Sequence, residues 1–296
     1  MFGDVLTAVV TPFDGDGRVD LQAFRTLARH LVDNGSDGLV VTGTTGEAPT
    51  LSDTERLSLY EAALDEIGDR ATVVAGTGTY DTAHSVHLTE QAHALGVHGV
   101  LVVTPYYNRP PQRGIVAHFE AVAAATDRPV IVYNIPGRCV TNIEPPTIAR
   151  LAEIDNVRAV KQAAQAADED AQARNIIDWG LVLYAGDDDL ILRFLKLGAL
   201  GGICVHTHVV GPQVKELVER FKAGDVAGAE TLDAELRPAI ELLRVTTNPV
   251  GIKRALELLG HDVGGLRLPL VEADEAETSQ IRDCLERLGL LAGAPA

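Results

Sequence analysis

Lysine is scarce in this sequence, and the position of one lysine is informative. Five of the 25 basic residues are lysines, and four of them lie in stretches with helical periodicity. Lys161 instead closes the apolar run 157–161, which has the character of a buried strand. Burial lowers the pKa of a lysine from about 10.4 and supplies the neutral amine that attacks a ketone. Lys161 is therefore a candidate for Schiff-base chemistry. The alternative is a structural ion pair with the acidic cluster 187–189.

Tyrosine is also scarce, with six in the chain, and three of these stand where strands are expected to end: Tyr106, Tyr107 and Tyr133. A phenol beside a hydroxyl group, here Thr44 or Thr45, can pass protons to and from a bound substrate. The alternative is that the aromatic side chains only fill the open end of a barrel. Three together favour a proton relay.

Two segments have the chemistry to bind carboxylates. The run 43–46 (GTTG) offers two hydroxyl groups and exposed backbone N–H groups, which suit one carboxylate. It lacks the lysine and the spacing of a Walker phosphate loop. Arg138 follows a stiff Pro-Gly turn and could hold a second carboxylate through both arms of its guanidinium. For a lone arginine the alternative is a surface ion pair.

Histidine and cysteine give weaker signals. His206 and His208 have the spacing of a metal-binding pair at the end of a strand, but no third histidine or matching glutamate is evident at another strand end. We therefore expect no metal site. The three cysteines show no paired spacing, which predicts neither a disulfide framework nor a structural zinc site.

The elements that must position these residues alternate along the chain. Short β-branched runs predict strands at 5–10, 38–42, 72–75, 99–103, 130–133, 157–161, 181–185 and 202–205. Helical periodicity predicts helices at 21–34, 52–67, 82–95, 112–125, 145–151, 170–178, 189–197 and 209–223. Several of these begin at a capping residue and end near a glycine. After Gly224 the alternation stops, and the stretches 226–246, 249–259 and 276–288 are all helical in pattern.

Eight strands alternating with eight helices predict a parallel sheet, and the number eight favours a closed (β/α)8 TIM barrel over an open sheet. We expect a catalytic barrel at 1–224 and a C-terminal helical extension at 225–296, packed on the barrel because no Pro- or Ser-rich linker separates them. In such a barrel the site lies at the carboxyl ends of the strands. Each candidate residue named above falls there.

The composition argues against two classes of binding partner. The net charge of −17 argues against a nucleic acid or an anionic membrane as a partner, since both select a basic face. No apolar run approaches the roughly 18 residues of a membrane span. The first residues carry an early Asp4 and no basic leader, so together with the few cysteines they predict a cytoplasmic protein.

Taken together, these motifs resemble the dihydrodipicolinate synthase/N-acetylneuraminate lyase family of pyruvate-dependent class I aldolases. The resemblance runs over nearly the whole chain and rests on the segments 11–13 (TPF), 43–47 (GTTGE), 103–107 (VTPYY), 133–138 (YNIPGR), Lys161, 186–188 (GDD) and 248–249 (NP). Arg138 points to the branch that uses aspartate semialdehyde, because the sugar-acid lyases of the family generally lack an arginine there.

The resemblance implies a role for each residue. Lys161 condenses with pyruvate to an imine, so no separate cofactor is needed, and Tyr133 passes protons through Thr44 and Tyr107. Thr45 holds the pyruvate carboxylate. The remaining roles concern the second substrate, aspartate semialdehyde: Arg138 binds its carboxylate, and Gly186 and the carbonyl of Ile203 shape its pocket. Tyr107 enters from a neighbouring subunit of a homotetramer built as a dimer of dimers. The product serves lysine and diaminopimelate synthesis.

Departures from the family pattern keep alternatives open. Residues 162–165 (QAAQ) replace an acidic residue and a small-residue turn, and His206 and His208 replace smaller or neutral residues. Both changes touch the side of the second substrate, so an aldolase for 2-keto-3-deoxy sugar acids or 4-hydroxy-2-oxoglutarate is the alternative function. Two more distant alternatives are a catalytically silent binding module and a metal-dependent hydrolase.

A second departure concerns regulation. Six residues stand where lysine-inhibited members typically carry Ser, Ala, His, His, Asn and Glu: Ala48, Pro49, Asp53, Arg56, Tyr80 and His84. The loss of the acid at position 84 removes a partner for the ammonium group of lysine. We therefore expect weak or absent feedback inhibition by lysine.

Overall fold

The computed structural model describes residues 2–164 and 169–292 of the 296-residue chain. Gln165, one of the departures noted above, lies outside the described residues, as do the last four residues of the predicted extension. No helix in the described parts is long and apolar enough to span a membrane.

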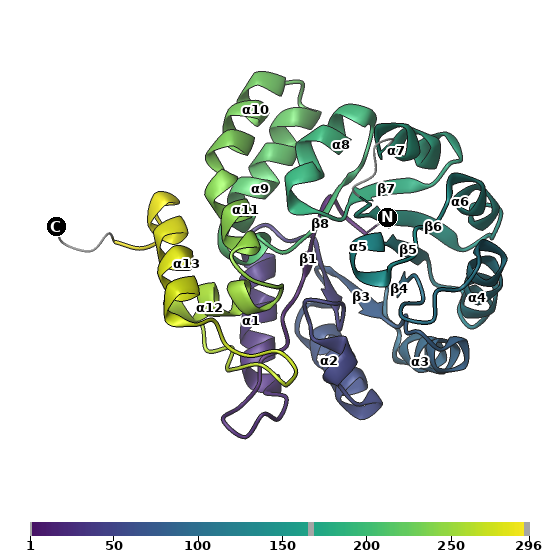
Figure 1. The fold of residues 1–296 in the computed structure, drawn as a ribbon, viewed down its shortest axis with the longest axis horizontal. Helices are drawn as coiled ribbons and strands as arrows, with labels where there is room; N and C mark the ends of the chain where they lie inside the picture. Colours follow the sequence, from purple (N-terminus) through teal and green to yellow (C-terminus); the bar gives the residue numbers. More distant parts are fainter. Residues whose placement is uncertain (1, 165–168, 293–296) are drawn as a thin grey trace.

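Eight parallel strands close into a barrel in which neighbours in the chain are neighbours in the sheet, and the last strand pairs with the first. They are β1 (Val5–Ala8), β2 (Gly38–Val41), β3 (Thr72–Gly76), β4 (Gly99–Val103), β5 (Val130–Asn134), β6 (Val157–Gln162), β7 (Val182–Ala185) and β8 (Gly201–Cys204). Figure 1 shows the helices arranged around these strands. The predicted TIM barrel is confirmed, and the strand boundaries differ from the expected ones by one or two residues at most.

The helices that follow the strands are α1 (Leu21–Asp33), α2 (Asp53–Ile67), α3 (Thr82–Leu95), α4 (Gln112–Ala124), α6 (Pro145–Leu151), α7 (Glu169–Asp178), α8 (Ile191–Leu197) and α9 (Thr207–Lys222). The first three begin at side chains that accept N–H groups of their first turn. Asp20 accepts two backbone N–H groups at the start of α1, and Ser52 forms a reciprocal capping box with Glu55 at the start of α2. These caps fix where the loops after β1 and β2 end and their helices begin.

Two expectations about helices were incomplete. The single helix expected at 226–246 is two helices, α10 (Val226–Glu235) and α11 (Arg237–Arg244). Pro238 lies in the first turn of α11, and a proline has no N–H and clashes with the carbonyl four residues earlier, so one continuous helix cannot pass through it. The short helix α5 (Pro136–Cys139), in the loop after β5, was not predicted.

The barrel has an inner and an outer apolar layer. The inner layer fills the barrel with buried side chains such as Leu6, Val40, Val74 and Ile131. The outer layer lies between the strands and the helices. Parallel pairing places Lys161 of β6 level with Tyr133 of β5 and Tyr184 of β7, so the lysine reaches the carboxyl end of the barrel from within an ordered sheet.

The residues after α9 pack against the barrel. They form α10, α11, α12 (Val250–Leu258) and α13 (Glu275–Arg287), which lie together beside α9 and α1 in Figure 1. Lys253 of α12 forms a buried ion pair with Glu47, in the loop after β2, with an Nζ to Oε1 distance of 2.8 Å. Arg267 reaches back to pair with Glu55 of α2. The division into units at residue 224 stays a prediction.

Candidate active site

A cavity of about 250 Å³ opens at the carboxyl ends of the strands, where the sequence predicted the site. Its wall includes six residues that the sequence analysis singled out: Thr44, Thr45, Tyr133, Arg138, Lys161 and Gly186. They come from four different loops or strand ends, after β2, β5, β6 and β7. The barrel therefore brings together residues that are more than a hundred positions apart in the chain.

Lys161 has the environment that amine chemistry requires. Its side chain is buried, with 5% of the residue exposed, and Nζ lies 4.2 Å from the centroid of the Tyr133 ring. Burial lowers the pKa of Lys161 to about 8, and the nearby Asp188, Cys204 and Asp187 oppose that shift. A substantial fraction of the amine is therefore neutral at mildly alkaline pH.

Tyr133 lies beside Lys161 and is itself buried. Burial raises the pKa of its phenol above the usual value, and Asp187 raises it further, while Arg138 and a hydrogen bond with Thr44 act in the opposite direction. A phenol that stays protonated can donate a proton to a reacting group and recover one through its hydroxyl neighbour. The geometry thus joins Lys161, Tyr133 and Thr44 into one chemical unit.

Asn248 links the two expected carboxylate-binding positions. Its side-chain Nδ2 donates to Thr45 Oγ1 at 3.0 Å, and its backbone oxygen accepts a hydrogen bond from Arg138 Nη2 at 3.3 Å. Asn248 also lines the cavity. The sequence analysis noted the Asn-Pro dipeptide but assigned it no role, although its position just before the first turn of α12 was the signal available.

Gly186 and Ile203, both expected to shape the pocket of the second substrate, differ in their position relative to the cavity. Gly186 lines the cavity, and its N–H donates to the carbonyl of Gln162 at 2.8 Å. A Cβ at this position would lie 2.8 Å from that same oxygen, so a larger residue would force β6 and β7 apart. Ile203 is fully buried in the inner layer of the barrel and is not part of the cavity wall. The proposed role of its carbonyl stays a prediction.

Tyr107 is not brought to the other candidates by its own chain. The residue is 91% exposed and adopts a left-handed backbone conformation with φ of 71°. Tyr106, by contrast, turns inward and lines a second cavity of about 200 Å³ that also includes Thr44, Tyr133 and Arg138. The exposed ring of Tyr107 is free to contact another molecule.

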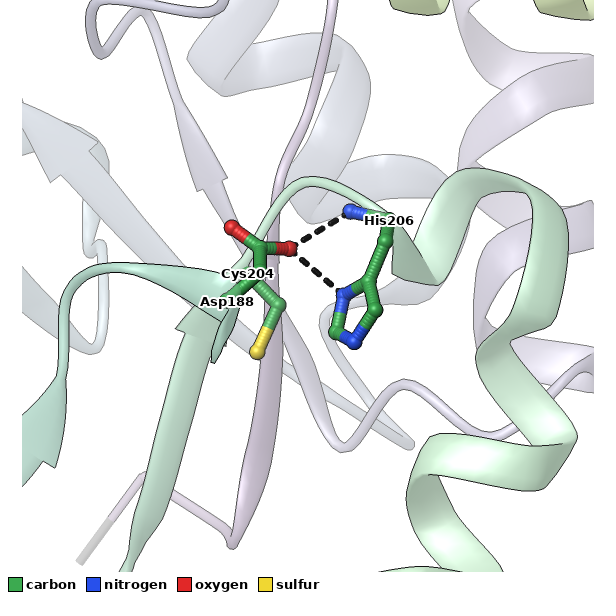
Figure 2. Close-up of side chains that lie close together, drawn as sticks. All are labelled: Asp188, Cys204 and His206. Carbon is green, nitrogen blue, oxygen red and sulfur yellow. Dashed lines mark hydrogen bonds and ion pairs between the residues drawn. The ribbon is translucent and has the colours of Figure 1, made fainter. Parts of the chain in front are cut away.

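The acidic cluster after β7 is engaged by groups other than Lys161. Asp188, in the single turn η2 (Asp188–Leu190), accepts the backbone N–H groups of Val205 and His206 at 2.7 Å each. Its Oδ1 also lies 2.5 Å from Nδ1 of His206, as Figure 2 shows. Although burial alone would raise it, the pKa of Asp188 is lowered by His206 and by the two N–H groups. Asp189 pairs with Arg244.

The side chains of His206 and His208, whose spacing is that of a metal-binding pair, have different partners. His208 directs Nδ1 to the carbonyl of Val205 at 2.7 Å and accepts the N–H of Val10 on Nε2 at 3.2 Å, so both of its nitrogens are occupied. His206 lies instead beside Asp188 and Cys204, whose potential ligand atoms and its own all lie within 4.8 Å of one another. The cavity chemistry described above uses none of these three side chains as a nucleophile or an acid.

Comparisons with known proteins agree with this geometry. The model of the Dihydrodipicolinate synthetase family matches residues 1–288. The 4-hydroxy-tetrahydrodipicolinate synthase of Desulforudis audaxviator is 49% identical, over 98% of this chain and 99% of its own. That of Synechococcus elongatus is 46% identical, over 98% and 97%. A dihydrodipicolinate synthase structure from Cyanidioschyzon merolae with lysine bound matches at a TM-score of 0.95 and 38% identity, over 98% and 99%.

Proposed function

We propose that this chain, which belongs to the dihydrodipicolinate synthetase family, condenses pyruvate with L-aspartate 4-semialdehyde through an imine on Lys161. The overall reaction is the one for which its full-length relatives are named: it yields 4-hydroxy-tetrahydrodipicolinate, and the enzyme is a lyase of lysine and diaminopimelate biosynthesis. The observation that carries the residue-level proposal is the burial of Lys161 against the ring of Tyr133 at the floor of the cavity.

The first half of the reaction uses Lys161 and its two hydroxyl neighbours. The neutral amine attacks C2 of pyruvate, and loss of water gives a protonated imine. Tyr133 donates the proton that the departing oxygen needs, and Thr44 connects the phenol to the next relay group. Loss of a proton from the pyruvate methyl group then gives an enamine, which is the carbon nucleophile.

The second half joins the two substrates. The enamine attacks the aldehyde carbon of aspartate semialdehyde and forms the new carbon–carbon bond. The amino group of that substrate then attacks the imine carbon, closes the ring and displaces Lys161, which regenerates the free amine. No external cofactor takes part, since the lysine itself activates pyruvate.

Two anion sites hold the substrates during these steps. The Thr45 hydroxyl and the adjacent backbone N–H groups hold the carboxylate of pyruvate, and Arg138 holds that of aspartate semialdehyde. Asn248 supports both, because it contacts Thr45 through its side chain and Arg138 through its backbone. Gly186, which lines the cavity, shapes the space for the second substrate. We assign the carbonyl of Ile203 to the same role from the family resemblance alone.

The proton relay is completed in an assembly. We place Tyr107 of a neighbouring subunit next to Thr44 and Tyr133 in a cytoplasmic homotetramer built as a dimer of dimers. The exposure of Tyr107 in the single chain supports this placement, because its side chain is 91% exposed and does not line the cavity of its own chain.

The decisive experiment combines turnover with trapping. Pyruvate-dependent consumption of aspartate semialdehyde, coupled to the next reductase of the pathway, tests the reaction, and borohydride reduction in the presence of pyruvate tests the imine. We expect turnover and one reduced pyruvate adduct on Lys161, and neither in the Lys161→Ala variant. Lys196→Ala is the matched control, because Lys196 is an exposed lysine paired with Glu230. An adduct on another lysine would refute the assignment, and turnover of sugar-acid aldehydes alone would refute the substrate.

A further inference from the structure

Three side chains of metal-ligand type meet where β7, β8 and α9 come together. Asp188 comes from the turn after β7, Cys204 ends β8, and His206 precedes the first turn of α9. Cys204 and His206 are each less than 3% exposed. Figure 2 shows an oxygen of Asp188 directed at Nδ1 of His206, with Cys204 beside them. The potential ligand atoms of the three side chains all lie within 4.8 Å of one another.

The contact between His206 and Asp188 holds two of these side chains together. Nδ1 of His206 is buried and lies 2.5 Å from Oδ1 of Asp188, with which it forms an ion pair. Two potential ligand atoms are thus next to each other in the buried interior, beside the thiol of Cys204. The neighbouring carboxylate, Asp189, does not belong to this cluster, because it pairs with Arg244.

The donor set selects the kind of cation. A thiolate, an imidazole and a carboxylate are ligands for zinc and for the similar thiophilic dication cadmium, whereas magnesium and calcium prefer oxygen ligands alone. Three protein ligands also leave one position of a tetrahedral site open. His208 adds no fourth ligand, because both of its ring nitrogens are already occupied.

We propose that Asp188, Cys204 and His206 form a binding site for a zinc-class dication, and that an ion bound there inhibits the enzyme. The site adjoins the cavity, since Asp188 and Val205 line the cavity wall together with Lys161. A dication held by Asp188 cancels the negative charge that faces Lys161 and repels the positively charged imine. The binding site does not depend on the proposed function; only the inhibition rests on it.

Cadmium absorption tests the binding site without any substrate. In a Cys139→Ser/Cys284→Ser variant, Cys204 is the last remaining thiol of the chain. We expect one equivalent of cadmium to produce the ultraviolet charge-transfer band of a cadmium–thiolate bond, and the band to vanish when Cys204→Ser is added. The absence of a band with Cys204 intact would overturn the proposal, and so would a band that survives its removal. Cys204→Ala, which places no polar atom in the buried strand, repeats the test if the serine variant melts early.

Zinc titration tests the inhibition. Zinc at ten times its dissociation constant leaves roughly a tenth of the sites free, so the yield of borohydride-trapped pyruvate falls roughly tenfold. The Cys204→Ser variant, freed of metal with a chelator, keeps the unliganded yield and resists the same zinc concentration. Cys139→Ser is the matched control and stays sensitive. Equal zinc sensitivity of the wild type and Cys204→Ser would overturn the inhibition. A failure of the wild type to form any adduct would instead refute the proposed function and leave the cadmium result standing.

Discussion

At the scale of single residues, we expect the buried amine of Lys161 to set the pH range in which the proposed reaction begins. Because burial lowers its pKa to about 8, the neutral fraction rises as the pH passes from neutral to mildly alkaline. We therefore predict that the rate of imine formation with pyruvate increases with pH and levels off above an ionisation near that value. The rate of borohydride-trapped adduct formation, measured as a function of pH, checks this. A profile centred on the usual lysine pKa of about 10.4 would contradict it.

A substitution of Asp188 tests whether that ionisation belongs to Lys161. Its negative charge favours the ammonium form and so raises the pKa of Lys161, against the effect of burial. Removing the charge in Asp188→Asn lowers the apparent ionisation further, and the profile moves to lower pH. Arg150→Gln, which alters an exposed ion pair away from the cavity, leaves the profile unchanged.

The proposed role of Arg138 concerns only one of the two substrates, and this can be tested. A hydrogen bond to a charged group contributes about 1.5–3 kcal/mol, so loss of the guanidinium weakens binding of one carboxylate roughly 10- to 100-fold. We predict that Arg138→Gln raises the KM for aspartate semialdehyde by that factor while the yield of trapped pyruvate stays close to wild type. Steady-state kinetics with each substrate varied in turn provides the measurement. An equal rise in the KM for pyruvate would contradict the assignment of Arg138 to the carboxylate of aspartate semialdehyde.

The sequence indicated Lys161 because a charged residue at the end of an apolar strand conflicts with its surroundings, and that conflict is visible locally. It did not indicate Asn248, whose partner Thr45 lies 203 positions earlier and becomes a neighbour only when the barrel closes. The alternative considered for Lys161 was an ion pair with the acidic cluster 187–189, yet the turn after β8 brings two N–H groups and His206 to Asp188. Contacts that join distant segments were thus beyond the reach of local patterns.

At the scale of elements, the pair of Glu47 and Lys253 joins α12 to the loop that carries the threonines. Both side chains are almost fully buried, and Lys253 Nζ also donates to the carbonyl of Gly265 at 2.6 Å. Removal of one partner leaves an uncompensated buried charge, which costs about 3–5 kcal/mol. We predict that Glu47→Gln lowers the free energy of unfolding by that amount, measured by urea denaturation.

The exposed pair Glu216–Arg220 supplies the comparison. Both of its side chains are about half exposed, and such pairs contribute about 0–1 kcal/mol. Glu216→Gln therefore leaves the urea midpoint almost unchanged. A loss in Glu47→Gln as small as that would show that the Lys253 charge finds water or another partner.

The alternation of strands and helices could be predicted because each element carries its own period and its own caps. Helix α3 has the expected bounds, Thr82–Leu95, with Asp81 capping its start and Gly96 in a left-handed conformation at its end. The break at Leu236 was missed because the apolar period continues across it, and the short helix α5 because four residues show no period. The strands and helices of the barrel have a clear period and could therefore be predicted. The loops that carry the site have no period, so their structure could not.

At the scale of the whole molecule, the region between α2 and α3 bears on regulation. Arg56 is buried and donates to the carbonyl of Ala48, and His84 lies 2.8 Å from Asp53, so the residues at these positions contact one another. A buried arginine also repels the ammonium group of lysine. We predict that millimolar L-lysine leaves turnover nearly unchanged at saturating substrates. Half-inhibition at sub-millimolar lysine would contradict this.

The proposed role of Tyr107 in a neighbouring subunit's site can be tested with two variants that we expect to be inactive. Lys161→Ala removes the amine, and Tyr107→Phe removes the exposed hydroxyl that we place in a neighbour's site. When the two chains are expressed together, half of the tight dimers are mixed, and in each of these one site has an intact Lys161 facing an intact Tyr107 from the other subunit. We predict recovery of roughly a quarter of the wild-type turnover, because half of the sites in half of the dimers are complete. If Tyr107 served its own chain, every site would lack one group, and the mixture would be no more active than the average of the two variants.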